Sequence, residues 1–399
     1  MPFFVFMLLI YNDIGNMKFR LILRLLLFCF ILPKPLMAQV VPSLKFNQLT
    51  VRDGLSTNAV RFIHEDEQGI MWIGTSKGLN RYDGSGFRVY RHIEGDDQTI
   101  CNDVINTIVP DKENKFWLGT IGGLSHFNPK NGLAVNYYHE DGNPNSLASD
   151  LKCDPFIDHR GRVWVATAAG IQLLNEKSKT FTTYTVPPGK RANPEIANYF
   201  TQIKEDSHHR LWAITPYAVY LFDEKNKRLV ERLKSDDIGV NTSVYETASG
   251  QIYLGQAKKG LIKFNVLGNS VEVLQQPSPA IASSKVHSIL EWKSDPDHNW
   301  LCIAATGGLT LRNLNTGISR EFVYDPLDPS SLHAFTIYHL AKDRQNRLWL
   351  STDNGINIID PNLQNFENLA VYQQHLFDQV VVEGTATLGG TLDLVINYM

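Results

Sequence analysis

The chain has 399 residues and a formal net charge of −3, with 43% hydrophobic and 11% aromatic residues. This composition can bury a large core, and the balanced charge lacks the basic surplus typical of nucleic-acid-binding proteins. We therefore expect no nucleic-acid partner. The four cysteines form no CxxC pair, so the sequence indicates neither a zinc site nor a disulfide framework, and we predict buried, apolar thiols.

Residues 1–38 predict a secretory signal. A start-like segment at Met17 has a basic beginning, an apolar run over 21–32 and a small residue at Ala38. This layout is typical of a signal peptide that begins at Met17 and is cleaved near Ala38. An uncleaved anchor helix is the alternative, but Arg24 interrupts the run, which is shorter than the ~20 residues that a membrane span requires. We predict a periplasmic or secreted mature chain.

Seven related segments follow the signal. The first runs from Trp72 to Asp83, and each later one carries an aromatic anchor and, in most cases, a glycine before an apolar strand. The anchors recur every 41 to 49 residues, at Trp72, Trp117, Trp164, Trp212, Tyr253, Trp300 and Trp349. Only Trp292 among the tryptophans is not an anchor. A period of about 40–50 residues with one aromatic per unit indicates a radial or stacked repeat fold.

The first unit predicts a meander of short strands. Residues 44–51 look like a single strand, and four more are expected at Val60–His64, Met71–Thr75, Leu79–Tyr82 and Phe87–Tyr90. Four antiparallel strands with one aromatic make a propeller blade, and no segment has a helical apolar period of useful length. We predict an all-β, seven-bladed β-propeller of four-stranded antiparallel blades over residues 39–372.

The seventh unit needs an outer strand, and the sequence offers two. Phe46–Leu49 precedes the first unit, and Phe366–Tyr372 follows the last. The first choice joins the two ends of the chain in one blade and removes exposed sheet edges, so we expect the N-terminal strand to close the last blade. Residues 373–399 are β-prone and punctuated by glycine, and read as the start of another β element or as a truncated fusion.

Three units depart from the pattern, in the residues near their turns. The fourth has Ala218 in place of glycine, the fifth has Tyr253 in place of tryptophan, and the sixth has two extra residues before Gly308. Such changes alter loops on one face of a propeller, where function usually lies.

An aspartate recurs in the turn before the anchor of five units, and its expected role is turn formation through side chain to backbone hydrogen bonds. These residues are Asp66, Asp111, Asp158, Asp206 and Asp343. The run Asp66, Gly69, Trp72 is faintly similar to the aspartate box of sialidases. The arginine cluster and Tyr–Glu pair that those enzymes need have no visible counterpart.

Catalytic motifs are missing from the sequence, and we predict no catalytic residue, cofactor or metal. There is no His-Glu-x-x-His pair and no glycine-rich phosphate loop. His208 and His209 form a paired imidazole in a hairpin turn, but a metal there would need a third ligand and a dry site, so a solvated turn is favoured. A propeller lyase with a histidine base is an open alternative, and His287 and His333 could face its funnel.

The repeats resemble the propeller repeats of two-component regulators over about residues 44–372. The motif appears as Asp53-Gly54-Leu55-Ser56, then Asp66–Gly69, then Trp72–Tyr82, and Asn145-Ser146-Leu147 and Ser330-Ser331-Leu332 match the turn before the inner strand. The resemblance implies the extracytoplasmic sensor region of hybrid histidine kinases of Bacteroidetes, which senses carbohydrate. Full-length members carry two propellers, an immunoglobulin-like domain, a membrane helix and a kinase.

None of those later parts is visible here, so the chain is a fragment, a stand-alone relative or a rearranged gene. The resemblance implies a second propeller or a kinase subunit as a partner. The resemblance implies contact with a membrane only through the N-terminal signal or through a missing C-terminal region.

The loops leading into the inner strand and those after the anchor strand share one face of a propeller, around its axis. Amides, carboxylates and aromatic rings there suit a sugar, because they can bond hydroxyls and stack on a pyranose. For any single residue, an ordinary solvated loop is the favoured explanation. A lyase or glycosidase, and a structural scaffold, are alternatives to binding an oligosaccharide or other small ligand. The candidate ligand-binding residues are Asn58, Lys77, Asn102, Tyr199, Tyr217, Lys258, His333, Asp353 and Asn354.

Overall fold

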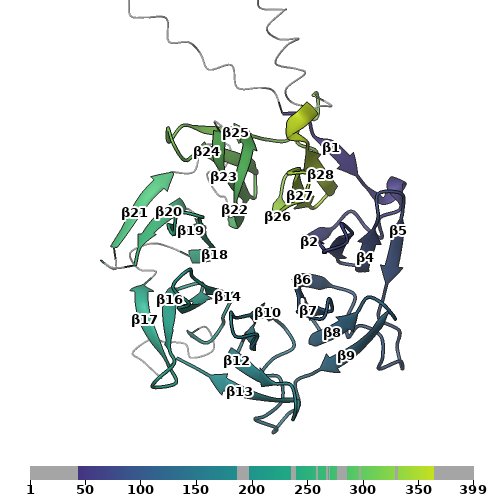
Figure 1. Cartoon of the computed structure of the whole chain (residues 1–399), viewed down its shortest axis with the longest axis vertical. Helices are drawn as coiled ribbons and strands as arrows, with labels where there is room; N and C mark the ends of the chain where they lie inside the picture. The colour runs from purple at the N-terminus through teal and green to yellow at the C-terminus, as the bar shows by residue number, and fades with distance from the viewer. Residues whose placement is uncertain are drawn as a thin grey trace, which may run out of the picture. The chain divides into compact units, whose positions relative to one another are not determined.

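The predicted seven-bladed propeller is confirmed by the computed structural model of the chain. The structure describes residues 44–186, 197–234, 240–257, 259–266, 268, 270–275, 285–295, 298–328 and 331–363. Within these ranges, seven four-stranded antiparallel sheets form a ring around a central opening, and almost no helix accompanies them (Figure 1). The predicted signal at residues 1–38 and the tail at residues 373–399 lie outside the described residues.

Each blade runs outward from its first strand, which lines the central opening. The blades consist of β2 (Val60–Glu65), β3 (Met71–Thr75), β4 (Gly78–Tyr82), β5 (Phe87–Tyr90); β6 (Ile105–Pro110), β7 (Phe116–Thr120), β8 (Leu124–Asn128), β9 (Leu133–Tyr137); β10 (Cys153–Ile157), β11 (Val163–Thr167), β12 (Gly170–Asn175), β13 (Thr180–Tyr184); β14 (Gln202–Glu205), β15 (Leu211–Thr215), β16 (Ala218–Asp223), β17 (Arg228–Lys234); β18 (Val240–Glu246), β19 (Ile252–Ala257), β20 (Gly260–Asn265), β21 (Ser270–Gln275); β22 (Val286–Asp295), β23 (His298–Ala305), β24 (Gly308–Asn313), β25 (Ser319–Phe322); and β26 (Ile337–Lys342), β27 (Leu348–Thr352), β28 (Gly355–Ile359), β1 (Asn47–Leu49).

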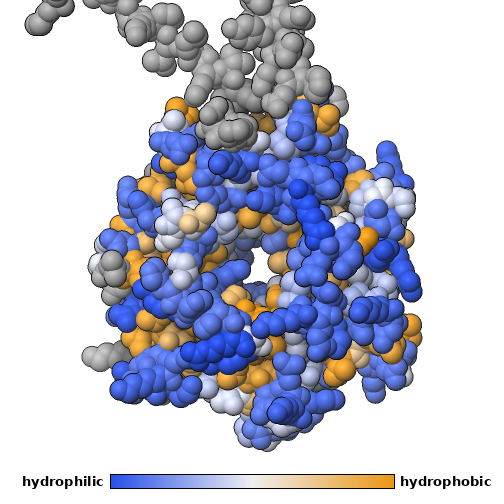
Figure 2. All heavy atoms as spheres, viewed as in Figure 1, coloured by the Kyte–Doolittle hydropathy of each residue, from blue (hydrophilic) through white to orange (hydrophobic). Residues whose placement is uncertain are grey.

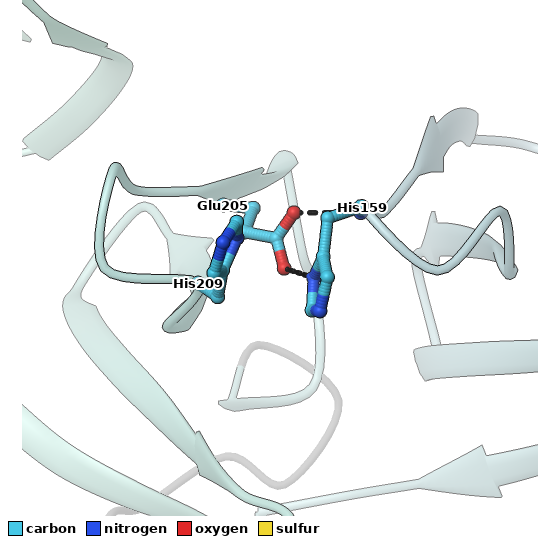
Figure 3. A group of neighbouring side chains, drawn as sticks. All are labelled: His159, Glu205 and His209. Atoms are coloured by element: carbon cyan, nitrogen blue, oxygen red, sulfur yellow. Dashed lines mark hydrogen bonds and ion pairs between the residues drawn. The ribbon is translucent and has the colours of Figure 1, made fainter.

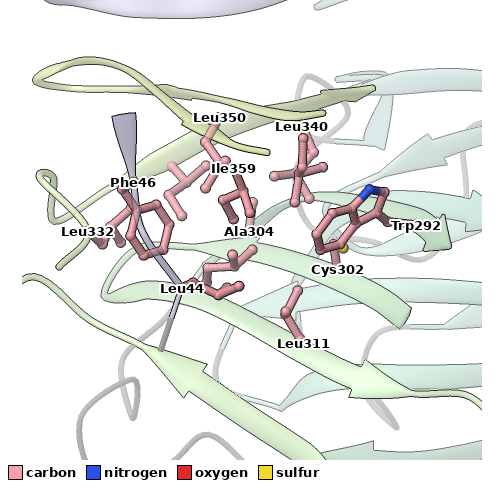
Figure 4. Close-up of a cluster of buried hydrophobic side chains, with 13 residues drawn as sticks. Leu44, Phe46, Trp292, Cys302, Ala304, Leu311, Leu332, Leu340, Leu350 and Ile359 are labelled. Atoms are coloured by element: carbon pink, nitrogen blue, oxygen red, sulfur yellow. The ribbon is translucent and has the colours of Figure 1, made fainter. Parts of the chain in front are cut away.

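The N-terminal strand closes the ring, as predicted. β1 pairs antiparallel with β28, from Asn47 opposite Ile358 to Leu49 opposite Ile356. Just before it, Leu44 and Phe46 are buried in the core between the sixth and seventh blades (Figure 4). The competing candidate, Phe366–Tyr372, lies outside the described residues.

The strand predicted over residues 44–51 is wrong in its extent, because β1 is shorter. The chain leaves the sheet at Thr50 and enters a 3₁₀ turn, η1 (Val51–Asp53). The carboxylate of Asp53 accepts the backbone N–H of Thr50 at 2.8 Å, while the Thr50 hydroxyl accepts the N–H of Arg52 at 3.2 Å. These local side-chain bonds satisfy the backbone groups in place of a strand partner.

The tryptophan anchors wedge neighbouring blades together. Trp72 of the first blade is buried among Ile105, Ile108 and Phe116 of the second, and its ring lies 4.9 Å from that of Phe116. Trp117, Trp164, Trp212 and Trp349 pack in the same way into the clusters shared with their following blades. Apolar burial between blades therefore holds the ring together.

Trp292, the tryptophan outside the repeat, has a related role. It lies in the first strand of the sixth blade, is fully buried, and donates its indole N–H to the carbonyl oxygen of Asn346 in the seventh blade at 2.9 Å (Figure 4). The anchor of that blade, Trp300, packs only at the edge of the same cluster. Cys101, Cys153 and Cys302 are buried and free, as predicted.

A left-handed glycine lets the third strand of a blade approach the fourth. Gly355 has φ 91°, and a Cβ there would lie 2.5 Å from the carbonyl oxygen of Leu49. Gly308 is similar, because its φ is 141° and a Cβ there would lie 2.2 Å from the carbonyl oxygen of Phe322. The fourth blade fits Ala218 at this place with a bulge between Val219 and Tyr220, which shifts the pairing of β16 with β17.

We expect Gly355→Ala to lower the free energy of unfolding by about 1–3 kcal/mol, because alanine combines a strained φ with a backbone clash. The clash falls on the strand pair that closes the ring. Chemical denaturation of both proteins measures the difference. Gly86→Ala is the matched control, since a Cβ there meets no atom within 4 Å. Equal losses at the two positions would contradict this account.

Candidate functional site

The antiparallel meander places two kinds of loop on opposite faces of the ring. Turns between the second and third strands, and the segments leading into the first strand, lie on what we call the funnel face. Turns between the first and second strands, which hold the recurring aspartates, lie on the opposite face. The sequence-predicted binding residues that the structure describes lie on the funnel face.

Asn58, Asn354 and His333 come together where the seventh blade meets the first. The side-chain amide of Asn58 donates to the Asn354 amide oxygen at 3.3 Å, and the Asn354 amide donates to the carbonyl oxygen of His333 at 2.9 Å. The Asn58 amide oxygen also accepts the N–H of Val51 at 3.0 Å. These amides therefore already stabilise the loops at the ring closure, and a ligand would have to share them.

Other predicted residues lie at separate points around the rim. Lys77 and Asp353 are exposed on the turns that follow β3 and β27. The side chain of Asn102 is half-buried, and its amide oxygen accepts the N–H of Val104 at 2.8 Å, so it shapes the loop leading into β6. Lys258 lies outside the described residues.

The fourth blade presents two exposed aromatic rings on the funnel face. Tyr199 precedes β14 and Tyr217 follows β15, and each side chain is 39% exposed. Since Gln202 pairs with Ile214, both tyrosines lie at the same end of these two strands. Phe335, which is 58% exposed and leads into β26, adds a third ring that the sequence reasoning missed. Its position two residues after His333, in the segment leading into an inner strand, was the available signal.

The inner strands line the central opening that is visible in Figure 2. His339 stacks on Phe62 with ring centroids 3.7 Å apart, and its Nδ1 accepts the N–H of Ile63 at 3.4 Å. Burial, with Lys204 and His64 nearby, lowers the pKa of His339 to about 3. The channel wall therefore holds neutral imidazole at physiological pH.

His287, the candidate base, lies at the start of β22. Its Nε2 is 3.0 Å from the hydroxyl oxygen of Thr306, and its ring meets Tyr338 edge-on. Burial, followed by the charge of Lys285, lowers the pKa of His287 to about 4. The imidazole is thus neutral at pH 7 but a weak base, whereas an efficient general base has a pKa near the working pH.

A pocket of about 690 Å³ opens on the opposite face, between the first and second blades. Polar side chains of several blades line it, among them Glu65, Arg81, Asp111, Lys130 and Arg344. None of the sequence-predicted binding residues contributes to it. This pocket is a second place where a polar ligand could bind, and variants can distinguish it from the funnel face.

The recurring aspartates on that face are structural, as predicted. In the third blade, one oxygen of Asp158 accepts the N–H groups of Arg160 and Arg162, and the other accepts the Trp164 indole N–H at 3.0 Å. Arg162 Nε donates to the same oxygen at 2.6 Å. The carboxylates of Asp66, Asp206 and Asp343 likewise accept the indole N–H of their anchor tryptophans. Asp111 differs, because it bonds to His126, whose ring stacks on Trp117.

A glutamate of the inner strand links two neighbouring blades at four of the junctions. Its carboxylate accepts the backbone N–H of the residue that follows the turn aspartate, or its threonine counterpart, in the preceding blade. The sequence analysis did not find this link, because its two residues belong to different repeats. The pairs are Glu65 with Arg344, Glu205 with His159, Glu246 with Ser207 and Glu291 with Ala248, at 2.7–2.8 Å.

Residues 54–77, which include the first turn aspartate and Trp72, match the family described as the two-component regulator propeller. Among curated proteins, the chain is similar to Histidine kinase P4 of Formosa agariphila, with 42% identity over 55 residues, or 14% of this chain and 4% of that protein.

Solved structures share the fold of this chain. The extracellular domain of a hybrid two-component system from B. thetaiotaomicron matches with a TM-score of 0.67 and 23% identity, over 79% of this chain and 42% of that one. Virginiamycin B lyase from Staphylococcus aureus matches with a TM-score of 0.58 and 14% identity, over 79% of this chain and 98% of that one. The chain thus spans less than half of the extracellular domain it matches.

None of the helical turns in the described part of the chain has the length and apolar character needed to cross a membrane.

Proposed function

We propose that this propeller is an extracytoplasmic binding module of a two-component regulatory system, and that it recognises a carbohydrate fragment on its funnel face. The observation that carries the proposal is the pair of exposed rings, Tyr199 and Tyr217, at one end of the fourth blade. Aromatic faces stack on pyranose rings, and the amides and charged groups around the rim can bond hydroxyls.

The match of residues 54–77 to the two-component regulator propeller supports the regulatory part of this proposal. The matched repeat is that of two-component regulators, and the similar curated protein is a histidine kinase. Binding alone transmits no signal, so the proposal requires a partner, which is a second propeller or a kinase subunit. The ligand must favour one arrangement of these parts, because a ligand shifts an equilibrium only through its differential affinity.

A glycan array of neutral and acidic oligosaccharides, followed by calorimetry on the hits, tests the proposal. We expect Tyr199→Ala and Tyr217→Ala each to weaken binding several-fold, which corresponds to the roughly 0.5–1.5 kcal/mol of a ring contact. Tyr138→Ala is the matched control, because that exposed tyrosine follows the outer strand β9 of another blade. Arg81→Ala reports on the pocket of the opposite face.

No bound oligosaccharide on the array would refute the carbohydrate proposal. Binding that is lost in Arg81→Ala and retained in both tyrosine variants would move the ligand to the opposite face.

A propeller lyase is the second candidate, and the likeness to virginiamycin B lyase over 98% of that chain favours it. His287 is the residue that would act as the base. The same oligosaccharides, incubated with the protein for hours and analysed by mass spectrometry, separate the two functions. Intact recovery supports a binding module, whereas cleavage that disappears in His287→Ala supports the lyase.

A further inference from the structure

Three potential metal ligands from two blades meet on the face opposite the funnel. His159 lies in the turn after β10, Glu205 ends β14, and His209 lies in the turn after β14 (Figure 3). One ligand atom from each residue lies within 4.8 Å of the other two. The rings of His159 and His209 stack with their centroids 4.0 Å apart, and the Glu205 carboxylate reaches the same place.

Glu205 is already fixed in the orientation that a metal would need. Its Oε2 accepts the backbone N–H of His159 at 2.8 Å, which is the blade-to-blade link described above. Its Oε1 lies 2.5 Å from Nδ1 of His159. The carboxylate is only 12% exposed, so the link holds it in place while Oε1 remains directed at the imidazoles.

The donor set fits a divalent transition-metal cation. Two imidazole nitrogens and one carboxylate oxygen are a ligand set that zinc uses, with water in the fourth position. Zinc bonds of about 2.0–2.2 Å place neighbouring ligand atoms roughly 3.3–3.5 Å apart. The ligand atoms, now within 4.8 Å of one another, would have to draw closer, and the two histidines whose imidazoles would move are exposed. A cation would replace the proton shared by Nδ1 and Oε1, and that proton would pass to solvent.

The other junctions with this glutamate lack the imidazoles. Glu65 faces Arg344 of the preceding blade, and the residue that corresponds to His209 is Gly69. At the Glu246 junction the corresponding residues are Ser207 and Gly250. Glycine or asparagine suits this left-handed position, whereas His209 adopts it with φ 59°. The third and fourth blades thus place two histidines where the repeat requires none.

Charged residues of both signs surround the cluster. Arg160 Nε donates to Nε2 of His159 at 3.4 Å, which leaves the proton on Nδ1, and its Nη1 pairs with Glu224 at 3.0 Å. Glu224 also binds Arg162. Because Arg160 is exposed and already pairs with Glu224, it can give up its bond to Nε2 of His159 when a cation occupies Nδ1.

We propose that His159, Glu205 and His209 bind one Zn²⁺ or a similar divalent transition-metal cation, which clamps the third blade to the fourth. The site lies on the opposite face from the proposed sugar site and depends on none of its residues. The aspartate and glutamate network beneath it supplies the rigid support that such a site needs.

Zn²⁺ titration of the metal-free full chain by calorimetry tests the site. We expect one Zn²⁺ per chain, and at least about tenfold weaker binding in His209→Gly, since even outer-shell changes cost 10–100-fold in metal affinity. Glycine suits the left-handed backbone, so this variant should unfold without metal at a temperature no lower than the unaltered chain. Added Zn²⁺ should raise the unfolding temperature of the unaltered chain only.

Two more variants make the test specific. Glu205→Gln keeps an oxygen for the His159 backbone N–H but removes the anionic ligand, and it should also lose the site. His208→Ala is the matched control, because this neighbouring histidine is exposed in the same turn and outside the cluster; it should bind Zn²⁺ normally. An unaltered chain that binds no Zn²⁺, or a His209→Gly variant that binds it equally well, would overturn the proposal.

Discussion

Asp158→Ala is expected to lower the free energy of unfolding by about 3–5 kcal/mol, the cost typical of removing one partner of a buried ion pair. The Asp158 side chain is fully buried. Its loss would leave the Trp164 indole and two backbone N–H groups of the turn without their acceptor. Denaturant unfolding, in the presence of a chelator, measures the change.

The same substitution should also change the response to acid. Burial by itself raises the pKa of Asp158, but hydrogen bonds from Trp164 and Arg162 outweigh it, so the pKa is lowered overall. A lowered carboxyl pKa stabilises the fold above the unfolded value of about 3.9, and this contribution is lost as the pH falls below it. The unaltered chain should therefore lose stability more steeply than Asp158→Ala in acid.

The fifth blade offers a matched control, because Thr247 replaces the aspartate where Tyr253 replaces the tryptophan. The Thr247 hydroxyl accepts the Gln251 N–H at 3.2 Å, and there is no indole for it to hold. Thr247→Ala should cost about 1 kcal/mol, the value of one ordinary hydrogen bond. A loss as large as that of Asp158→Ala would show that the indole contact is unimportant.

Phe46→Ala combined with Leu44→Ala is expected to prevent stable ring closure. Both side chains are at least nine-tenths buried against Leu309, Leu332 and Leu350. Phe→Ala and Leu→Ala in cores cost about 3–5 and 2–5 kcal/mol, so the pair approaches the 5–15 kcal/mol that stabilises a typical domain. β1 would then separate from β28 and expose a strand edge that favours aggregation.

Size-exclusion chromatography and thermal unfolding measure this effect. We expect a lower unfolding temperature and a concentration-dependent loss of monomer. Asn47→Ala is the matched control on the same strand, because its side chain is exposed and its backbone pairing with Ile358 is unchanged. A double variant that remains monomeric and as stable as this control would show that the N-terminal segment does not close the ring.

Much of the fold was predictable because the residues that form each strand and turn interact within a single repeat. Residues 71–75 and 87–90 were predicted as strands at their observed bounds, and the turn aspartate and the anchor tryptophan lie six residues apart within one unit. Interactions this local depend little on the rest of the molecule. Even β1 could be predicted, since a propeller has a sheet edge to cover at the last blade.

The candidate sites were less predictable because they depend on how one blade meets the next. The sequence placed Asn58 and Asn354 on the funnel face, but only the ring brings their amides within 3.3 Å, across 296 residues. For the pair His208 and His209 the sequence favoured a solvated turn and predicted no metal. The ring brings His159 and Glu205 close to His209 from positions 50 and four residues earlier in the chain.

By itself, the sequence determined the number of blades, their strand order, the turn chemistry and the anchors, because hydrophobic period and short-range hydrogen bonds are properties of a single repeat. The tertiary structure alone decided which side chains face each other between blades. Those contacts depend on the angle and register at which packed sheets meet, and close packing of apolar side chains between blades sets that geometry.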